Sequence, residues 1–343
     1  MKILQVIDQL NIGGAERVVL DLSNILCEHK EDVTLLSIRG VGILNEYLDK
    51  RIKFIAMERQ SKYSLTEMKR FVNIANNYDI IHVHMRHTMA YVAVALLLKP
   101  SMRKRVVFHD HYGDINIDKA CPIPLRYSLR HCTAAYIGVS QQLVNWAKSW
   151  NVKNCMLLPN IVRKQMPNYK TNIASGYVSV GNIRTTKNYL HLIKIAKTLP
   201  NAHFTIYGNR NEPNYYENVV AEKGDNVDII EGVSNVQPLL PNYKVAIHSA
   251  PSETGPLVLI EYMAQGIPFI TYDTGEVVEQ VKEELPELIL DTFDVAVWVE
   301  RLQYIEIHYE VLKSKLSEVY EKYYSEYKYY QSCKQIYKNV LNS

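Results

Sequence analysis

Residues 2–38 read KILQVIDQLNIGGAERVVLDLSNILCEHKEDVTLLSI, and this stretch indicates how the first half of the chain folds. Its two short apolar runs, Ile3–Ile7 and Val33–Ile38, have the length of buried strands. Between the runs, apolar residues recur at the spacing of one helix face: Val18, Leu22, Ile25 and Leu26. A strand, a helix and a second strand in this order predict a βαβ unit of a parallel sheet.

The same alternation continues along the chain. In the first half, further strands are expected at Ile80–His84, Arg105–His109 and Ala135–Val139. A polar stretch containing Pro167 interrupts the pattern, which then restarts with a helix around Leu190–Leu199. The strands expected in this second series are Tyr177–Val180, Ala202–Tyr207, Val227–Ile230, Val245–His248 and Pro268–Tyr272. We therefore expect an α/β protein with two Rossmann-like domains, each built on a parallel sheet.

The pattern also predicts where the domains end. We expect an N-terminal domain over residues 1–160, a linker over 161–175 and a C-terminal domain over 176–314. Residues 315–343 are expected to form a helix that can return to the first domain. Its tyrosines at positions 320, 323, 327 and 330 recur every three or four residues, so we interpret them as one packing face.

Composition excludes several functional classes. The net charge of +3 is too small for nucleic acid to be the main partner. Five scattered cysteines form no CxxC pair and are expected to be reduced thiols. Neither a signal peptide nor an apolar run of about 18 residues is present, which favours a cytoplasmic protein. Peripheral contact with the inner face of the membrane stays open, because the basic turn at residues 99–105 could meet anionic head groups.

Gly13 and Gly14 form the first candidate site, between the first strand and the first helix. Glycine lets the backbone approach a ligand closely, and a helix start offers free N–H groups to phosphate. A tight turn without a ligand is the other interpretation. The motif is not GxGxxG, so a nicotinamide oxidoreductase is poorly supported.

The second candidate site is the segment SETGPLVLIEYMA, residues 252–264. Pro256 suits a first helical position, while Gly266 and Pro268 suit the end of the helix. The helix between them is apolar on all sides except at Glu261. Because a buried carboxylate is costly without partners, Glu261 either has a structural partner or accepts hydrogen bonds from ligand hydroxyls. Glu253 stands in the loop at the entrance to this helix.

In these segments the chain resembles the retaining glycosyltransferases of family 4, which have the GT-B fold of two Rossmann-like domains facing across a cleft. That family has two glutamates separated by seven residues and followed by Gly-x-Pro. Glu253, Glu261 and Gly266-Ile267-Pro268 match this pattern. Other matching segments, in the expected order, are Gly13–Glu16, Asp79–His84, Ile137–Ser140, Leu158–Asn160 and Val180–Lys187.

The resemblance implies roles for individual residues. Glu261 would hold the ribose of a nucleotide-sugar, Glu253 the donor sugar, and Lys187 the diphosphate. His111 matches the family histidine near the reacting centre. The backbone N–H groups that would help to bind the diphosphate are those of Gly13 and Gly14 and those around Pro256, at Gly255, Leu257 and Val258.

One departure from the family pattern concerns the diphosphate-binding segment. The family commonly has arginine where this chain has Asn182, and Arg184 stands two places later. Arg184 is therefore the candidate for the missing charge.

No metal and no other cofactor is implied by the resemblance, because the family needs none and the chain has no DxD motif. His82, His84 and His87 suggest a metal site at first sight, but no Cys or Asp completes a recognisable spacing, so strand-end packing or cleft lining is the preferred interpretation.

The predicted function is thus transfer of a sugar from a nucleotide-sugar, with UDP or GDP as the favoured nucleotide, to a glycan or a lipid-linked acceptor. Such an enzyme would serve the synthesis of a bacterial cell-envelope polysaccharide, for example lipopolysaccharide or capsule. Two alternatives on the same fold stay open: a non-catalytic protein that binds nucleotide-sugars, and a nucleotide-sugar epimerase.

Overall fold

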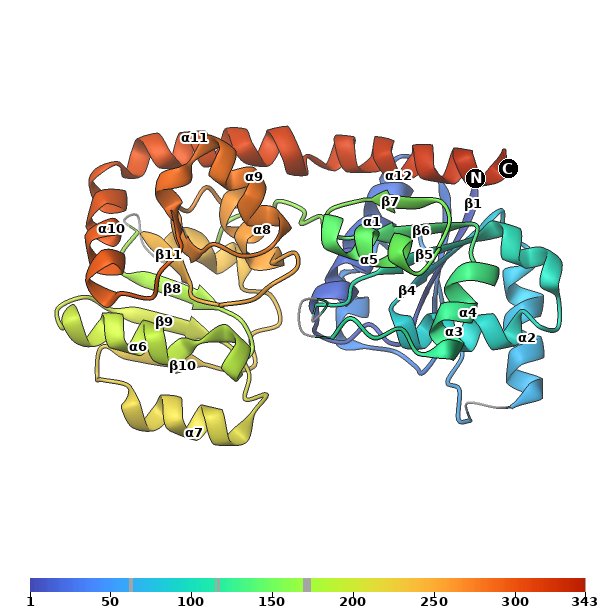
Figure 1. Ribbon diagram of the computed structural model, residues 1–343, viewed down its shortest axis with the longest axis horizontal. Helices are drawn as coiled ribbons and strands as arrows, with labels where there is room; N and C mark the ends of the chain where they lie inside the picture. The colour runs from blue at the N-terminus through green and yellow to red at the C-terminus, as the bar shows by residue number, and fades with distance from the viewer. Residues whose placement is uncertain (62–63, 114, 116–117, 169–173, 343) are drawn as a thin grey trace. The chain divides into compact units, whose positions relative to one another are not determined.

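The computed structural model describes residues 1–61, 64–113, 115, 118–168 and 174–342. The chain forms two compact units: unit 1 is Met1–Ile161 together with Glu326–Ser343, and unit 2 is Val162–Ser325. Part of the expected linker, residues 169–173, lies outside the described residues. Each unit has its own parallel sheet with helices packed against it (Figure 1).

Unit 1 is built on seven parallel strands in the order β3-β2-β1-β4-β5-β6-β7. The strands are β1 (Lys2–Ile7), β2 (Asp32–Ser37), β3 (Lys53–Ala56), β4 (Ile80–His84), β5 (Val106–Asp110), β6 (Ala135–Gly138) and β7 (Cys155–Leu157). The α-helices are α1 (Gly14–Glu28), α2 (Leu65–Ala75), α3 (Arg86–Ala95), α4 (Ile123–His131), α5 (Gln141–Ser149) and α12 (Glu326–Leu341). The 3₁₀ helices are η1 (Ile43–Tyr47) and η2 (Pro100–Arg105).

Unit 2 repeats this plan with six parallel strands in the order β10-β9-β8-β11-β12-β13. The strands are β8 (Tyr177–Val180), β9 (Phe204–Tyr207), β10 (Val227–Ile230), β11 (Val245–His248), β12 (Phe269–Tyr272) and β13 (Ile289–Leu290). The α-helices are α6 (Tyr189–Thr198), α7 (Pro213–Glu222), α8 (Leu257–Ala264), α9 (Glu276–Glu284), α10 (Val295–Ile307) and α11 (Tyr309–Tyr324). The 3₁₀ helices are η3 (Thr185–Lys187), η4 (Gln237–Asn242) and η5 (Pro286–Leu288).

The two doubly wound sheets confirm the predicted α/β architecture of two Rossmann-like domains. Every strand predicted from an apolar run is present, with ends that shift by no more than two residues. Three short strands, β3, β7 and β13, were missed. Each is at an edge of its sheet and has only two to four residues, so it gives little periodic signal.

The C-terminal tyrosines do not form the single packing face that their spacing predicted. Helix α11 ends at Tyr324 and α12 begins at Glu326, so the helical periodicity breaks between them. Tyr320 is buried in unit 2 and donates a hydrogen bond to the Val162 carbonyl at 2.8 Å. Tyr330 is buried in unit 1, whereas the Tyr327 side chain is 63% exposed. The prediction failed because spacing alone does not show where a helix is interrupted.

The basic turn at residues 99–105 is partly occupied by structural contacts. Lys99 Nζ donates to Asn76 Oδ1 at 2.7 Å, and Arg105 donates to the carbonyl of Tyr78 at 2.7 Å. These two side chains therefore fix the end of α2 against the turn. Among the described residues, no helix is both long enough and apolar enough to cross a bilayer.

Candidate functional site

Both sheets reverse their strand order at a central pair of strands. In unit 1 these strands are β1 and β4, and in unit 2 they are β8 and β11. Ligands of open parallel sheets bind beyond the carboxyl ends of the strands at such a switch point. The candidate residues predicted from the sequence lie at or directly after these strands, or after the next strand, β5.

Lys187 and Glu253 form an ion pair at the switch point of unit 2. Lys187 follows β8 at the end of η3, and Glu253 follows β11 in the loop before α8. The Lys187 Nζ atom donates a hydrogen bond to Glu253 Oε1. Each side chain is only 15% exposed, so both charges are largely removed from water. The fold thus brings together two residues that are 66 positions apart.

The charge of Lys187 keeps Glu253 ionised. Burial by itself would raise the pKa of Glu253, but the charge and hydrogen bond of Lys187, with further contributions from His248 and Arg184, outweigh this and hold the pKa below its ordinary value. His248 Nε2 lies 3.8 Å from Glu253 Oε1. Burial lowers the pKa of His248 to about 4, so this ring is neutral at pH 7 and is not an ionic partner. His248 was missed by sequence reasoning, although it is the last residue of β11.

Neighbouring loops hold the ion pair in place. Ser249 Oγ donates to the Lys187 and Asn188 carbonyls, both at 3.1 Å, and so ties the end of β11 to the lysine loop. The Glu253 backbone N–H donates to Thr274 Oγ1 at 3.0 Å. Gly181, with φ +152°, leaves room for the lysine stem, because an added Cβ would lie 3.3 Å from Lys187 Cε. Sequence reasoning identified the pair but not Ser249 or Thr274.

Arg184 and Asn182 occupy different environments. Asn182 is exposed, whereas Arg184 is half-buried before η3. The charge of Arg184 lowers the pKa of Glu253, so its guanidinium contributes to the field at the ion pair. Its Nε atom is buried with no hydrogen-bond partner among the described residues. The arginine is therefore the second positive charge of this site.

Helix α8 begins at Leu257, one residue later than predicted, and Pro256 is its N-cap residue. Pro256 makes no side-chain capping hydrogen bond at this end, and the start of a helix presents backbone N–H groups that suit an anionic ligand. At the other end Gly266 has φ +66°, which completes a Schellman turn. Glu261 lies on the second turn of α8 and is only half-buried.

In unit 1 the helix start at Gly13 and Gly14 already faces an anionic group. Gly13 is the N-cap residue of α1, and a Cβ there would lie 2.3 Å from the Glu16 carboxylate. Burial raises the pKa of Glu16, and a hydrogen bond from its own backbone N–H partly offsets this effect. Gly13 is therefore needed to accommodate this carboxylate, and a phosphate at this helix start would compete with it.

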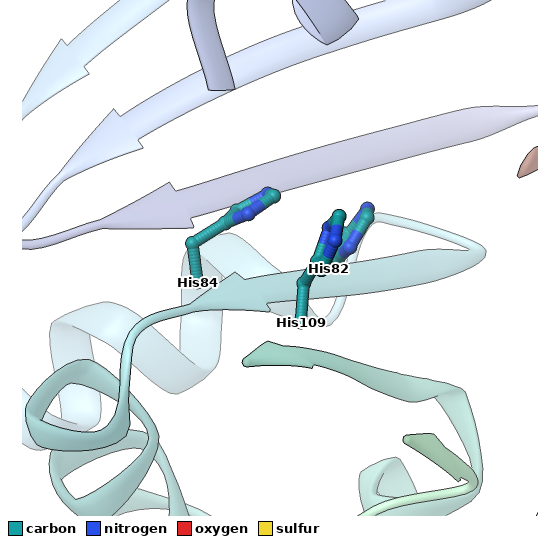
Figure 2. Close-up of side chains that lie close together, drawn as sticks. All are labelled: His82, His84 and His109. Atoms are coloured by element: carbon teal, nitrogen blue, oxygen red, sulfur yellow. The ribbon is translucent and has the colours of Figure 1, made fainter. Parts of the chain in front are cut away.

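Four imidazoles cluster beside the switch point of unit 1. His82 and His84 alternate along β4, and His109 and His111 do so at the end of β5. Ring centroids of neighbouring members lie 4.2–5.4 Å apart. Figure 2 shows His82, His84 and His109 on the same side of the sheet. Sequence reasoning grouped His87 with the β4 histidines, but the structure instead places His109 there, because β5 pairs with β4 in register.

The imidazole nitrogens are not spaced as they would be in a formed zinc centre. Nitrogen atoms of His82, His84 and His109 lie within 4.8 Å of one another. A tetrahedral zinc ion with Zn–N bonds of about 2.0–2.1 Å needs ligand atoms roughly 3.3 Å apart, so the rings would have to close inward. Both nitrogens of His84 are already hydrogen-bonded, to His111 and to Gln5. The absence of a metal stays a prediction.

The loop that carries His111 is fixed by Asp110. Arg86 donates to both carboxylate oxygens of Asp110 at 2.8–3.2 Å, and Tyr136 donates to it at 2.9 Å. The Arg86 guanidinium also stacks on Tyr112 at 4.0 Å from its centroid. With its oxygens occupied in this way, Asp110 positions the loop and is not available as a base.

Comparisons with known proteins agree with this arrangement. The model of the family described as glycosyl transferases group 1 matches residues 141–322, and that described as glycosyltransferase family 4 matches residues 12–165. The chain belongs to the glycosyl transferases group 1 family. This confirms the resemblance that was drawn from the two glutamates and the accompanying motifs, and the protein is a glycosyltransferase.

Individual relatives are distant in sequence but similar in fold. An uncharacterized glycosyltransferase of Haemophilus influenzae is 22% identical over 286 residues, which cover 79% of this chain and 80% of the relative. The crystal structure of Anabaena HepE with UDP and glucose has a TM-score of 0.79 at 15% identity and covers 98% of both chains. A glycosyltransferase structure from Rickettsia africae has a TM-score of 0.77 at 17% identity, covering 99% of this chain and 98% of that one.

Proposed function

We propose that this glycosyltransferase transfers a sugar from a nucleotide-sugar donor, with retention of configuration and without a metal ion. The donor is a UDP- or GDP-sugar, and the acceptor is a glycan or a lipid-linked sugar of the cell envelope. The proposal rests mainly on the buried Lys187–Glu253 pair at the switch point of unit 2. The UDP- and glucose-bound structure of HepE supports the donor class.

The pair supplies two opposite charges for two parts of the donor. Lys187, with Arg184 beside it, would face the diphosphate, and Glu253 would accept hydrogen bonds from the sugar hydroxyls. Glu261, on helix α8, would hold the ribose. Because each charge in the free protein is neutralised by the other, neither is left unpaired in its buried position before the donor arrives.

The chemistry follows from where charge develops. As the bond between the sugar C1 and the diphosphate oxygen breaks, negative charge grows on the phosphate and positive charge on the ring. Lys187 and the backbone amides at the start of α8 would stabilise the leaving group. A new bond forms between C1 and the acceptor oxygen on the same face, and the departing phosphate takes the acceptor proton. His111 is the residue that the family resemblance assigns to the reacting centre.

A panel of UDP-, GDP- and ADP-sugars tests the donor class, because a ligand that binds only the folded protein raises its melting temperature. The sugar that stabilises the protein is then incubated with candidate acceptors, with and without EDTA, and free nucleotide is measured. We expect acceptor-dependent nucleotide release that EDTA does not change. Binding without release would favour the non-catalytic alternative, and conversion of donor without acceptor would favour an epimerase.

The anomeric configuration of the product tests retention. Nuclear magnetic resonance of the product formed with the stabilising donor reports this configuration directly. We expect the configuration of the donor to be preserved, and an inverted product would contradict the same-face mechanism.

A further inference from the structure

A chain of five hydrogen-bonded side chains runs through unit 1 and ends at His111. Its members come from four elements or loops and meet beside the switch point: Gln5 on β1, His82 and His84 on β4, His111 after β5 and Tyr337 on α12. The first three and Tyr337 are fully buried, whereas His111 is partly exposed. The chain thus leads from the interior to a candidate site residue.

Four hydrogen bonds connect these residues. Tyr337 Oη lies 2.7 Å from His82 Nδ1 and 3.3 Å from Gln5 Nε2. Gln5 Oε1 lies 2.7 Å from His84 Nε2, and His84 Nδ1 lies 3.1 Å from His111 Nε2. Gln5 is therefore the centre of the chain, with its carbonyl toward His84 and its NH₂ toward Tyr337.

The histidines in this chain are neutral at pH 7. Burial lowers the pKa of His82 and of His111 to about 3, and lowers that of His84 well below its ordinary value. A neutral imidazole has one N–H donor and one acceptor nitrogen. Each ring must therefore place its hydrogen on one nitrogen, and its neighbours determine which.

The orientation of Gln5 determines all these placements. An amide oxygen only accepts, so the hydrogen of His84 is on Nε2 and its Nδ1 is an acceptor. His111 must then donate from Nε2 to His84, so its acceptor nitrogen is Nδ1; the Asn160 side chain also hydrogen-bonds this ring. The Cys333 thiol also interacts with Tyr337, whereas the hydrogen-bond partner of the Gln5 carbonyl is His84 Nε2.

We propose that Gln5 and Tyr337 are positioning residues that fix the proton of His111 on Nε2. Tyr337 accepts from the Gln5 NH₂ and so keeps the Gln5 carbonyl turned toward His84. Contact of His111 with the donor rests on the proposed function, but the position of its proton does not.

The tautomers can be measured directly in the full-length protein. Two-bond nitrogen–proton correlation spectra of protein labelled with ¹⁵N-histidine distinguish the Nε2–H from the Nδ1–H form of each ring. Substituting each histidine in turn assigns the signals. We expect His84 and His111 to be in the Nε2–H form. A predominant Nδ1–H form of His111 would show that the chain runs in the opposite direction and would overturn the proposal.

The substitution Gln5→Met tests whether Gln5 sets this direction. It keeps the shape of the side chain but removes the acceptor for His84 Nε2–H. In this variant His84 can still donate a hydrogen bond if its hydrogen moves to Nδ1, which faces His111. His111 Nε2 must then accept, so we expect the ratio of the Nδ1–H to the Nε2–H tautomer of His111 to rise about tenfold. Gln9→Met, just beyond the same strand and outside the chain, should leave the spectrum unchanged. An unchanged His111 in Gln5→Met would overturn the proposal.

The substitution Tyr337→Phe tests the far end of the chain and deletes only a hydroxyl. The Gln5 amide loses the acceptor that orients it, so we expect the populations of the two tautomers of His111 to lie within about threefold of each other. A single unchanged tautomer would remove Tyr337 from the proposal. If His111→Ala leaves donor turnover unchanged while these spectra behave as expected, the catalytic assignment of His111 fails and the positioning chain stands.

Discussion

The two units use the same sheet topology to place opposite kinds of electrostatics at their switch points. Unit 2 holds an ionised pair, Lys187 and Glu253, in which each charge stabilises the other. Unit 1 holds the four imidazoles of residues 82, 84, 109 and 111, which burial keeps neutral. Topology therefore determines where a site forms, and the local side chains determine whether it binds by charge or by neutral hydrogen bonds.

Removing the lysine from unit 2 should give the largest effect. We expect Lys187→Ala to lower kcat by roughly 10²–10³-fold, because a preorganised positive charge on the leaving group is lost. The donor KM should change less, since this charge matters most in the transition state. Steady-state kinetics measure both, with Lys197→Ala, an exposed lysine of the same unit, as the control. A rate within about threefold of the unmodified protein would remove Lys187 from the catalytic residues.

Acid should destabilise unit 1 through the histidines that burial keeps neutral. The pKa of His82 is about 3 in the folded protein and about 6.5 when unfolded, so below pH 6.5 the unfolded chain binds the proton first. Stability is therefore lost as the pH falls from 6.5 toward 3, by roughly 2 kcal/mol at pH 5 for this residue alone. Hydrogen exchange measured at several pH values reports this loss in peptides from β4 and β5.

The matched control for the acid prediction is His82→Gln, which retains a polar side chain but does not titrate. We expect this variant to lose roughly 2 kcal/mol less stability between pH 7.5 and pH 5 than the unmodified protein. Equal pH dependence in the two proteins would show that His82 is not held neutral by burial.

Removing the second glutamate of unit 2 should weaken nucleotide binding without abolishing it. We expect Glu261→Ala to lose roughly 1–3 kcal/mol of binding free energy, the contribution of one charged hydrogen-bonding partner. Isothermal titration calorimetry with the nucleotide that stabilises the protein measures this, and the exposed Glu222→Ala provides the control. Unchanged affinity in a folded Glu261→Ala variant would show that the ribose is held elsewhere.

Zinc should have the smallest effect, and it tests whether the imidazole cluster is a metal site. We expect one equivalent of Zn²⁺ to leave the melting temperature unchanged, because His84 would have to give up a hydrogen bond to bind it. A clear rise in melting temperature that disappears in His109→Gln would instead identify the cluster as a metal centre.

Sequence patterns predicted the parts of the fold that depend on local periodicity. Apolar runs predicted strands such as Ile80–His84 and Val245–His248. Gly266 predicted the end of α8, because glycine readily adopts the positive φ found there. The edge strands and the break at Ser325 were missed, because two to four residues, or one interruption, leave no periodic signal. The family motifs identified Lys187 and Glu253 by spacing.

By itself, the sequence determined the class of protein and the residue types of the site. Only the tertiary structure decided what those residues contact. It paired Lys187 with Glu253 across 66 positions, and it added His109 to the histidines of β4 through strand register. It also linked Gln5 to Tyr337 across 332 positions. Such contacts depend on strand order and register, and those are fixed by how the whole sheet packs, which no local spacing encodes.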